Sequence, residues 1–331
     1  MTQLPRIRLL IGPGTLPSQG SDRLDLLRYR KSGQPRLSGQ ELLERVPEIS
    51  GFARTQVDEA TPHGIATVED LRRLSLRMNE LLARPDIDGL VFVQGTNSIE
   101  ETAFFLNLTV RSTKPVVVTG AQRPFTGLSS DAPLNLLDSF RVAAHDESSG
   151  KGVLVVANGE INAARDVTKT STYHLQTFRS RDLGLLGYAE ADQVVYYRAP
   201  TRCHTRESEF DLASSGPLPR VDILYVSVSA EPGLAETALR LGAKGIVVAG
   251  SGAGSCGNLE EELAAIAAAG RAVVVRSSRV GEGRVIRNDN WQHPGMAAAD
   301  NLSPQKAALL LALALTRTAE PDEIQRMFER Y

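Results

Sequence analysis

The chain has 331 residues, 37 basic and 39 acidic, and a formal net charge of −2. That length allows two domains, or one large α/β unit, with an ample buried core. The near-neutral charge argues against nucleic acid as a partner, and no apolar run approaches the roughly 20 residues that span a bilayer. We therefore expect no membrane partner, and a soluble, cytoplasmic protein that binds a small molecule.

The few cysteines and histidines predict neither a disulfide framework nor a metal site. Cys203 and Cys256 are far apart in the sequence, and the five histidines are scattered singly. Structural metal sites need closely spaced ligands, and disulfide frameworks need more cysteines than this in a chain of such length. We expect no metal and no cofactor.

Short apolar runs bounded by glycine or proline predict buried strands. In chain order they cover 6–12, 89–95, 115–121, 152–159, 221–228, 245–250 and 272–278. Because the runs are continuously apolar rather than alternating, they are typical of a parallel sheet covered on both faces. Helical patterns over 67–83 and from Ser303–Pro304 onward lie between or after the runs, which indicates stacked βαβ units.

A polar segment rich in proline and serine, 199–220, interrupts this alternation. We therefore predict an N-terminal α/β domain over 1–200 that holds most of the active-site residues. A linker over 201–219 and a C-terminal α/β domain over 220–331 follow it.

The stretch GLVFVQGTNSIEETAFFLNLTV, 89–110, predicts a strand, a tight turn and a helix. Ser98 and Glu101 have the spacing of a capping box, so the helix should begin just after Ser98. The backbone amides of Thr96 and Asn97 would then lie near its positive end and could hold an anionic oxygen. Hydroxyl and amide residues in such turns also serve only to cap helices, so this stretch alone does not establish a site.

Two later stretches are as ambiguous when each is taken alone. Gly120 and Ala121 follow an apolar strand and would let a ligand approach the backbone. Lys169 lies in a polar run, where burial beside a hydroxyl would make it a base, although most lysines are simply solvated.

Together these stretches resemble the bacterial-type (type I/II) L-asparaginase family, from about residue 6 to Tyr331. The resemblance rests on QGTNSIEETAFFL (94–106), KPVVVTGAQRPFTGLSSDAPLNL (114–136), RDVTKT (165–170), VRSSRVG (275–281) and LSPQKAALLLALALT (302–316). It implies a parallel-sheet N-terminal domain and a smaller Rossmann-like α/β C-terminal domain. It also implies a homodimer or homotetramer whose active site is completed by a neighbouring subunit, and amide hydrolysis through a threonine nucleophile and an acyl intermediate.

Carried over by position, the resemblance assigns four catalytic residues, Thr96, Lys169, Thr15 and Tyr29. It assigns the substrate-binding positions Gly12, His63, Gly64, Gly95, Asn97 and Ala121. The family's attacking threonine falls on Gly12, which predicts that the usual nucleophile has been lost. The aspartate that holds the substrate's ammonium group falls on Asn97, which supplies no opposing charge.

Further positions of the family pattern are altered. The asparagine and the acidic residue that a neighbouring subunit contributes fall on Ala253 and near Asn290. Tyr29 lies in a segment that corresponds to the family's mobile lid, among the cations Arg28, Arg30, Lys31 and Arg36. These cations form either a solvated basic loop or a cover for an acidic substrate.

From these residues we predict a divergent amidohydrolase whose substrate is an amide other than free asparagine. Thr96 would be its nucleophile and Lys169 its base. Two alternatives remain open at this point: a non-hydrolytic enzyme such as an isomerase, a lyase or a biosynthetic tailoring enzyme, and an inactive metabolite-binding protein.

Overall fold

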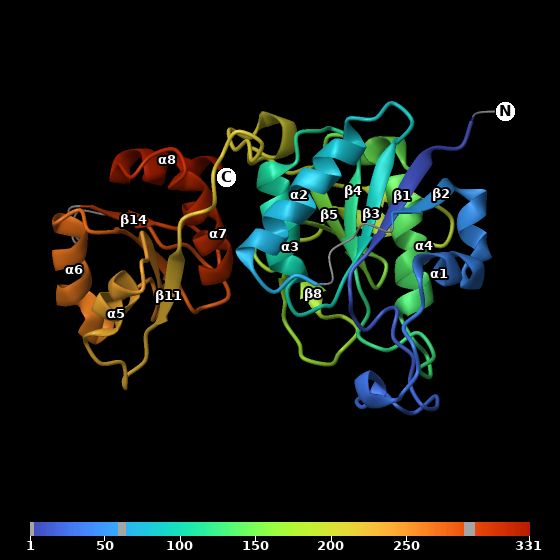
Figure 1. Ribbon diagram of the computed structural model, residues 1–331, viewed down its shortest axis with the longest axis horizontal. Helices are drawn as coiled ribbons and strands as arrows, with labels where there is room; N and C mark the ends of the chain where they lie inside the picture. The colour runs from blue at the N-terminus through green and yellow to red at the C-terminus, as the bar shows by residue number, and fades with distance from the viewer. Residues whose placement is uncertain (1–2, 59–63, 288–294) are drawn as a thin grey trace. The chain divides into compact units, whose positions relative to one another are not determined.

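The computed structural model describes residues 3–58, 64–287 and 295–331. The chain divides into two compact units, Met1–Ser208 and Glu209–Tyr331. Each unit is an α/β layer structure with its own sheet (Figure 1).

The N-terminal unit contains an eight-stranded sheet in the order β10-β9-β6-β5-β4-β3-β1-β2. Its strands are β1 (Arg6–Ile11), β2 (Arg54–Asp58), β3 (Gly89–Val93), β4 (Val116–Thr119), β5 (Val153–Ala157), β6 (Glu160–Ala163), β9 (Gly187–Ala189) and β10 (Val194–Tyr196). The neighbours from β2 to β5 are parallel, whereas β6, β9 and β10 continue the sheet in antiparallel pairing. A separate antiparallel ribbon joins β7 (Thr168–Lys169) to β8 (Phe178–Arg179).

Helices cover both faces of this sheet (Figure 1). They are α1 (Gly39–Arg45) and α4 (Ala132–Ala143) on one face, and α2 (Val68–Leu82) and α3 (Ile99–Thr109) on the other. Alternate residues of β3 enter the two cores: Val91 and Val93 pack on the α4 side, Leu90 and Phe92 on the α3 side. A strand buried on both faces must be apolar throughout, which is why β3 reads as a continuous apolar run.

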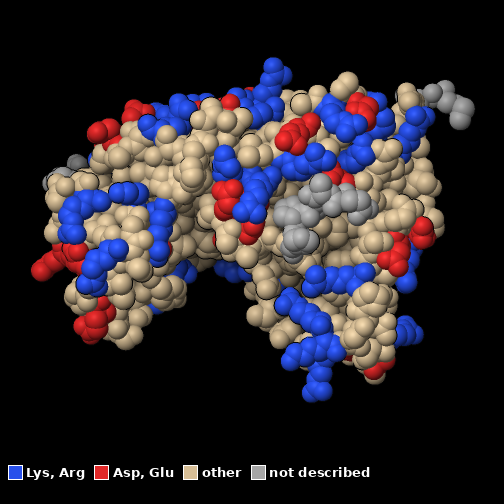
Figure 2. Space-filling model, viewed as in Figure 1, with Lys and Arg blue, Asp and Glu red and all other residues tan. Residues whose placement is uncertain are grey.

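Four short 3-10 helices complete the described part of this unit. They are η1 (Tyr29–Lys31), η2 (Pro47–Gly51), η3 (Asp146–Ser148) and η4 (Thr205–Glu207). In the space-filling view, Lys and Arg side chains gather on the lobe that carries η1, at the foot of the unit (Figure 2).

The C-terminal unit has a four-stranded parallel sheet in the order β11-β12-β13-β14. Its strands are β11 (Val221–Tyr225), β12 (Gly245–Gly250), β13 (Val273–Ser278) and β14 (Met296–Ala298). Its helices are α5 (Leu234–Arg240), η5 (Gly257–Leu259), α6 (Glu260–Ala268), α7 (Pro304–Ala314) and α8 (Pro321–Arg330). Apolar residues of α5 and α6 share one core with β11, β12 and β13, while α7 covers the opposite face (Figure 1).

The two-domain α/β fold predicted from the sequence is confirmed. Each apolar run predicted as a strand is one, and the helices expected over 67–83 and from Ser303–Pro304 are α2 and α7. The antiparallel strands β6, β9 and β10 were not predicted, since strands of three or four residues are too short for a clear apolar run. In the parts of the chain that the structure describes, no helix has the length and apolar character needed to cross a membrane.

The predicted capping box at the start of α3 is wrong. The helix does begin after Ser98, but the Ser98 side chain makes no capping hydrogen bond. Its ψ of 17° departs from the extended conformation that turns an N-cap oxygen toward the third helical N–H. Ser38 and Thr67, with ψ of 168° and 162°, have that conformation and do form capping boxes at α1 and α2.

Candidate active site

Three loops meet at the carboxyl edge of the N-terminal sheet, where polar side chains follow β1, β3 and β4. These strands are parallel neighbours, so their C-terminal ends share one edge, where α/β proteins bind ligands. The first two loops are in close contact: the Gly95 N–H donates to the Pro13 carbonyl at 3.0 Å. A Cβ at Gly14 would lie 2.5 Å from the Gly95 nitrogen, so the loops approach this closely only with glycine there.

Thr96 and Lys169 form a hydroxyl–amine pair. The Lys169 Nζ donates to the Thr96 Oγ1 at 2.7 Å, and that hydroxyl in turn donates to the Gln122 Oε1 at 3.1 Å. Burial lowers the pKa of Lys169, while the Glu100 carboxylate opposes that shift. A lysine with a lowered pKa has a larger neutral fraction, and the neutral amine can accept a proton.

Glu100 and Gln122 hold this pair in place, and neither was among the predicted site residues. The Glu100 Oε2 accepts the Lys169 backbone N–H at 2.8 Å, which ties β7 to the first turn of α3. The Gln122 backbone N–H donates to the Asp131 Oδ2 at 2.9 Å. Its Nε2 donates to the carbonyls of Thr172 and His174, each at 3.2 Å. Both residues lie inside the stretches that carry the family resemblance, which was the available signal for them.

Thr15 and Tyr29 form a second hydroxyl pair, 2.7 Å apart. Thr15 follows β1 and is only 5% exposed, and Tyr29 opens η1. The predicted loss of the nucleophile rested on Gly12. The structure nevertheless keeps a threonine hydroxyl in this loop, three residues further along the chain, with a phenol beside it.

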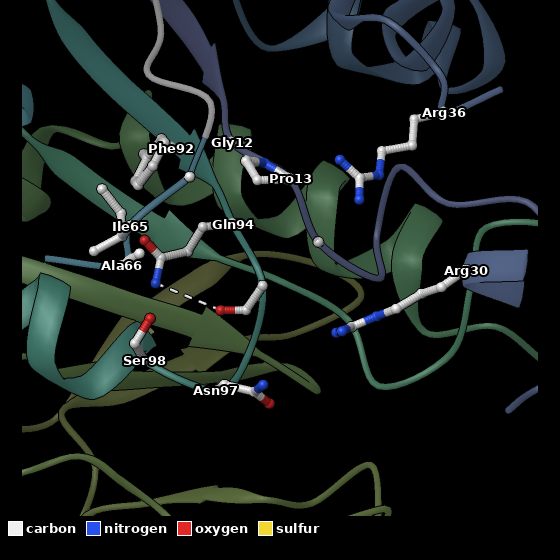
Figure 3. A pocket seen from close by; sticks show the side chains of 13 residues that line it. Gly12, Pro13, Arg30, Arg36, Ile65, Ala66, Phe92, Gln94, Asn97 and Ser98 are labelled. Atoms are coloured by element: carbon white, nitrogen blue, oxygen red, sulfur yellow. Dashed lines mark hydrogen bonds between the residues drawn. The ribbon is translucent and has the colours of Figure 1, made fainter. Parts of the chain in front are cut away.

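These residues line two adjoining pockets. The first, which we term the hydroxyl pocket, measures about 730 Å³ and is lined by Thr15, Leu26, Leu27, Tyr29, Arg30, Thr96, Asn97, Glu100, Gln122 and Lys169 together with Thr170–Tyr173. The second, termed the arginine pocket, measures about 310 Å³ and is lined by Gly12–Gly14, Arg30, Arg36, Gly64–Ala66, Phe92, Gln94, Gly95, Asn97 and Ser98 (Figure 3). Arg30 and Asn97 line both.

The predicted catalytic residues Thr15, Tyr29, Thr96 and Lys169 are therefore gathered in the hydroxyl pocket. The predicted binding residues Gly12, Gly64, Gly95 and Asn97 line the arginine pocket. Ala121 is not brought to either pocket, because its side chain is buried in the core on the α4 side of the sheet.

Three other predicted positions lie outside the described part of the N-terminal unit. His63 and Asn290 lie outside the residues that the structure describes. Ala253 lies in the turn after β12, in the C-terminal unit.

The turn before α3 also presents backbone donors. Among the described residues, the N–H groups of Thr96 and Asn97 have no hydrogen-bond acceptor, whereas those of Gln94 and Gly95 are taken by Thr119 and Pro13. Free N–H groups before a helix of eleven residues suit an anionic oxygen.

Paired hydroxyl and amine groups at the edge of an α/β sheet are the groups that an acyl-transferring hydrolase needs, and the sequence comparisons identify the family. Residues 6–202 match the family described as "Asparaginase, N-terminal", and residues 220–328 match "Glutaminase/Asparaginase C-terminal domain". The chain belongs to the asparaginase family and is an amidohydrolase that acts on carbon–nitrogen amide bonds.

Individual relatives match over nearly the whole chain. The L-asparaginase 2 of Bacillus subtilis (strain 168) is 41% identical over 330 residues, covering 99% of this chain and 87% of that protein. The glutaminase-asparaginase of Acinetobacter glutaminasificans is 38% identical over 325 residues, covering 96% and 97%. A crystal structure of a probable cytoplasmic L-asparaginase from Campylobacter jejuni superposes with a TM-score of 0.92 at 38% identity, covering 99% and 100% of the two chains.

These comparisons overturn the predicted substrate. Relatives between 35% and 41% identical over nearly the full chain are named L-asparaginase or glutaminase-asparaginase, so the prediction of an amide other than free asparagine is wrong. It rested on altered positions around the expected head group, Asn97 above all, and gave them more weight than the match along the whole chain. Membership of an amidohydrolase family likewise sets aside the non-hydrolytic and inactive alternatives.

Proposed function

We propose that this protein hydrolyses L-asparagine to L-aspartate and ammonia, with L-glutamine as a second substrate. The observation that carries the proposal is the placement of two hydroxyl groups, each with its own proton partner, in one hollow: Thr15 with Tyr29, and Thr96 with Lys169. Acyl transfer to a hydroxyl needs a nucleophile, a proton acceptor and donors for the developing oxyanion. Relatives named as asparaginases and glutaminase-asparaginases support the two substrates.

Thr15 is the nucleophile in this proposal, in place of Thr96. The Thr96 oxygen already accepts from Lys169 and donates to Gln122, which leaves it one lone pair. The Thr15 hydroxyl has a single side-chain partner among the described residues, Tyr29, so one or both of its lone pairs remain open. The less engaged oxygen is the better placed to attack, and the Thr96–Lys169 pair then serves as a proton relay.

The reaction proceeds in two steps. The Thr15 Oγ1 bonds to the amide carbon while its proton passes to the Tyr29 oxygen. The Tyr29 O–H gives its own proton to the amide nitrogen, which leaves as ammonia when the C–N bond breaks. Water then attacks the resulting ester and gives one proton through Thr96 to neutral Lys169. The Tyr29 O–H protonates the Thr15 oxygen as the C–O bond breaks, and the new carboxylic acid returns a proton to Tyr29. Lys169 then loses its proton to solvent, which restores the starting enzyme. The N–H groups of Thr96 and Asn97, which have no acceptor among the described residues, are candidates to hold the developing oxyanion.

The assembly and the compartment are also proposals. We infer a homodimer or homotetramer from the family resemblance. The edge strand β11 supports it, because Ile223 and Tyr225 leave large apolar side chains exposed there. The predicted cytoplasmic location stays a prediction, since similar relatives are named as both cytoplasmic and periplasmic.

The first experiment measures ammonia release from asparagine and glutamine by wild type, Thr15→Ala and Thr96→Ala. Thr113→Ala, at an exposed threonine in the loop after α3, is the control. We expect Thr15→Ala to lower kcat by about 10³-fold or more and to abolish the ester seen by intact mass spectrometry after acid quench. Thr96→Ala should lower kcat by about 10²-fold and still form the ester. Wild type that releases no ammonia from either amino acid, or a fully active Thr15→Ala, would overturn the proposal.

The pH dependence tests Lys169. Because burial lowers its pKa and the neutral amine is the active form, kcat/KM should rise with pH through a limb that lies below the ordinary lysine value of about 10.4. Lys169→Arg keeps the charge but cannot lose its proton near neutral pH, so this limb should disappear together with most of the activity. If Lys169→Arg is active and its kcat/KM rises with pH as in wild type, the titrating group is a residue other than Lys169.

A further inference from the structure

Arg30 lies where the hydroxyl pocket meets the arginine pocket. Among the described lining residues only Arg30 and Asn97 border both hollows. Figure 3 shows the Arg30 side chain reaching inward from η1 toward the turn that carries Asn97, and Arg36 pointing toward Gly12 and Pro13. Two guanidinium groups thus face one small hollow beside the reactive hydroxyls.

Neither guanidinium group is neutralised within the described structure. No described carboxylate lies within 4.0 Å of Arg30 or Arg36, although many other arginines of the chain are ion-paired. The one described carboxylate that lines either hollow is Glu100, and it accepts the Lys169 backbone N–H. The described boundary between the pockets is therefore cationic, and it favours an anionic group of the substrate.

The chemistry of asparagine brings its head group to this boundary. Two carbon atoms separate the side-chain amide carbon from the α-carboxylate carbon, so an amide carbon held at Thr15 leaves the carboxylate within the same small volume. We propose that Arg30 binds the α-carboxylate of the substrate and is a specificity-determining residue for the hydrolysis. The planar guanidinium fork matches a carboxylate with two parallel hydrogen bonds. This inference rests on the proposed function.

The described residues of the arginine pocket offer the α-ammonium group only neutral acceptors. Asn97 offers an amide oxygen at the boundary. Gln94, 3% exposed, lines the arginine pocket with an Oε1 that has no hydrogen-bond partner among the described residues. A neutral oxygen compensates a buried ammonium less than a carboxylate does. The enzyme should therefore discriminate more strongly for the carboxylate of its substrate than for the ammonium.

The test combines variants with truncated substrates. Arg30→Gln removes the charge, and Arg30→Lys keeps the charge without the fork. Arg28→Gln and Lys31→Gln remove neighbouring exposed cations that line neither hollow. Each enzyme is assayed with asparagine, with succinamic acid, which lacks the ammonium, and with 3-aminopropanamide, which lacks the carboxylate. A compound that is not turned over is measured as a competitive inhibitor.

In Arg30→Gln we expect the KM for asparagine and for succinamic acid to rise about 10- to 100-fold. The kcat should stay within about threefold of wild type, because the lost contact binds the substrate and the transition state equally. Arg30→Lys should recover part of this loss. The KM or inhibition constant of 3-aminopropanamide should be the same in Arg30→Gln as in wild type. In the wild-type enzyme this compound should bind more weakly than succinamic acid. Both control variants should behave as wild type.

The outcomes separate this inference from the proposed function. If wild type hydrolyses asparagine but Arg30→Gln behaves as the controls do, the assignment of Arg30 is overturned while the proposed function stands. It is also overturned if Arg30→Gln weakens all three compounds equally, since that indicates a displaced Tyr29 and not a lost carboxylate contact. Absence of asparagine hydrolysis by wild type would instead reject the proposed function.

Discussion

Gly12 and Gly14 lie two residues apart in the loop after β1, and their surroundings differ sharply. A Cβ at Gly12 would meet the Phe92 ring and the Val93 carbonyl at 3.4 Å, which is ordinary van der Waals contact. A Cβ at Gly14 would lie 2.5 Å from the Gly95 nitrogen and 2.7 Å from the Gln94 carbonyl carbon. Both are backbone atoms of the turn that carries Thr96, so they cannot move aside without moving the site.

Gly14→Ala should therefore lower kcat/KM for asparagine by about tenfold or more and destabilise the fold by about 1–3 kcal/mol, because overpacking displaces the turn. Gly51→Ala is the matched control, with the same added methyl group at a position where a Cβ would meet no atom within 4 Å, and should stay within about threefold of wild type. Ammonia release and thermal unfolding measure both. Equal effects of the two substitutions would contradict this account of the loop contact.

At the scale of elements, one buried side chain joins helix α4 to the loops of the site. Asn135 is 2% exposed, and its Nδ2 donates to the Gly120 carbonyl at 2.9 Å and to the Asp131 Oδ2 at 3.2 Å. Its Oδ1 accepts the N–H of Asn158, in the turn between β5 and β6, at 2.7 Å. Asp131 also accepts the backbone N–H of Gln122, so this network positions the acceptor of the Thr96 hydroxyl.

Asn135→Ala removes these bonds and leaves the buried Gly120 carbonyl and the part-buried Asn158 N–H without this partner. We expect it to lower the free energy of unfolding by about 2–4 kcal/mol, measured by urea denaturation. Leu134→Ala is the control on the same helix; Leu134 is 56% exposed, and its truncation should cost less than about 0.5 kcal/mol. A cost for Asn135→Ala as small as that of the control would show that water satisfies the freed groups.

At the scale of the whole molecule, the edge of the C-terminal sheet is the surface to account for. Ile223 and Tyr225 on β11 are 42% and 62% exposed, and Val228 just beyond the strand is fully exposed. An unpaired strand edge with apolar side chains tends to associate with another chain. Our proposal of a homodimer or homotetramer gives this edge a role.

Light scattering on the full chain at micromolar concentration should give the mass of two or four chains. Tyr225→Lys, which places a charge at the edge, should shift the distribution toward smaller species because like charges then face one another. Ile286→Lys, at another exposed apolar side chain outside β11, controls for the added charge. A protein that is monomeric and fully active at every concentration would reject the proposed assembly.

The amino-acid sequence by itself determined the apolar strands β1, β3, β4, β5, β11, β12 and β13, the helices α2 and α7, and the family. Apolar runs, helix starts and motifs are local patterns, and the match extends along almost the whole chain. Reasoning from single positions was less secure. Gly12 suggested a missing nucleophile and Asn97 a different substrate, because each was judged without its neighbours in space.

Only the tertiary structure decided which side chains meet. Lys169 reaches Thr96 across 73 positions of sequence, and Gln122 reaches it across 26. Such contacts depend on the order of strands in the sheet, which places the ends of β1, β3 and β4 side by side. The same order brings Arg30 and Asn97 to one boundary. Distances between residues remote in sequence are fixed by how the elements pack, and no local pattern of residues encodes them.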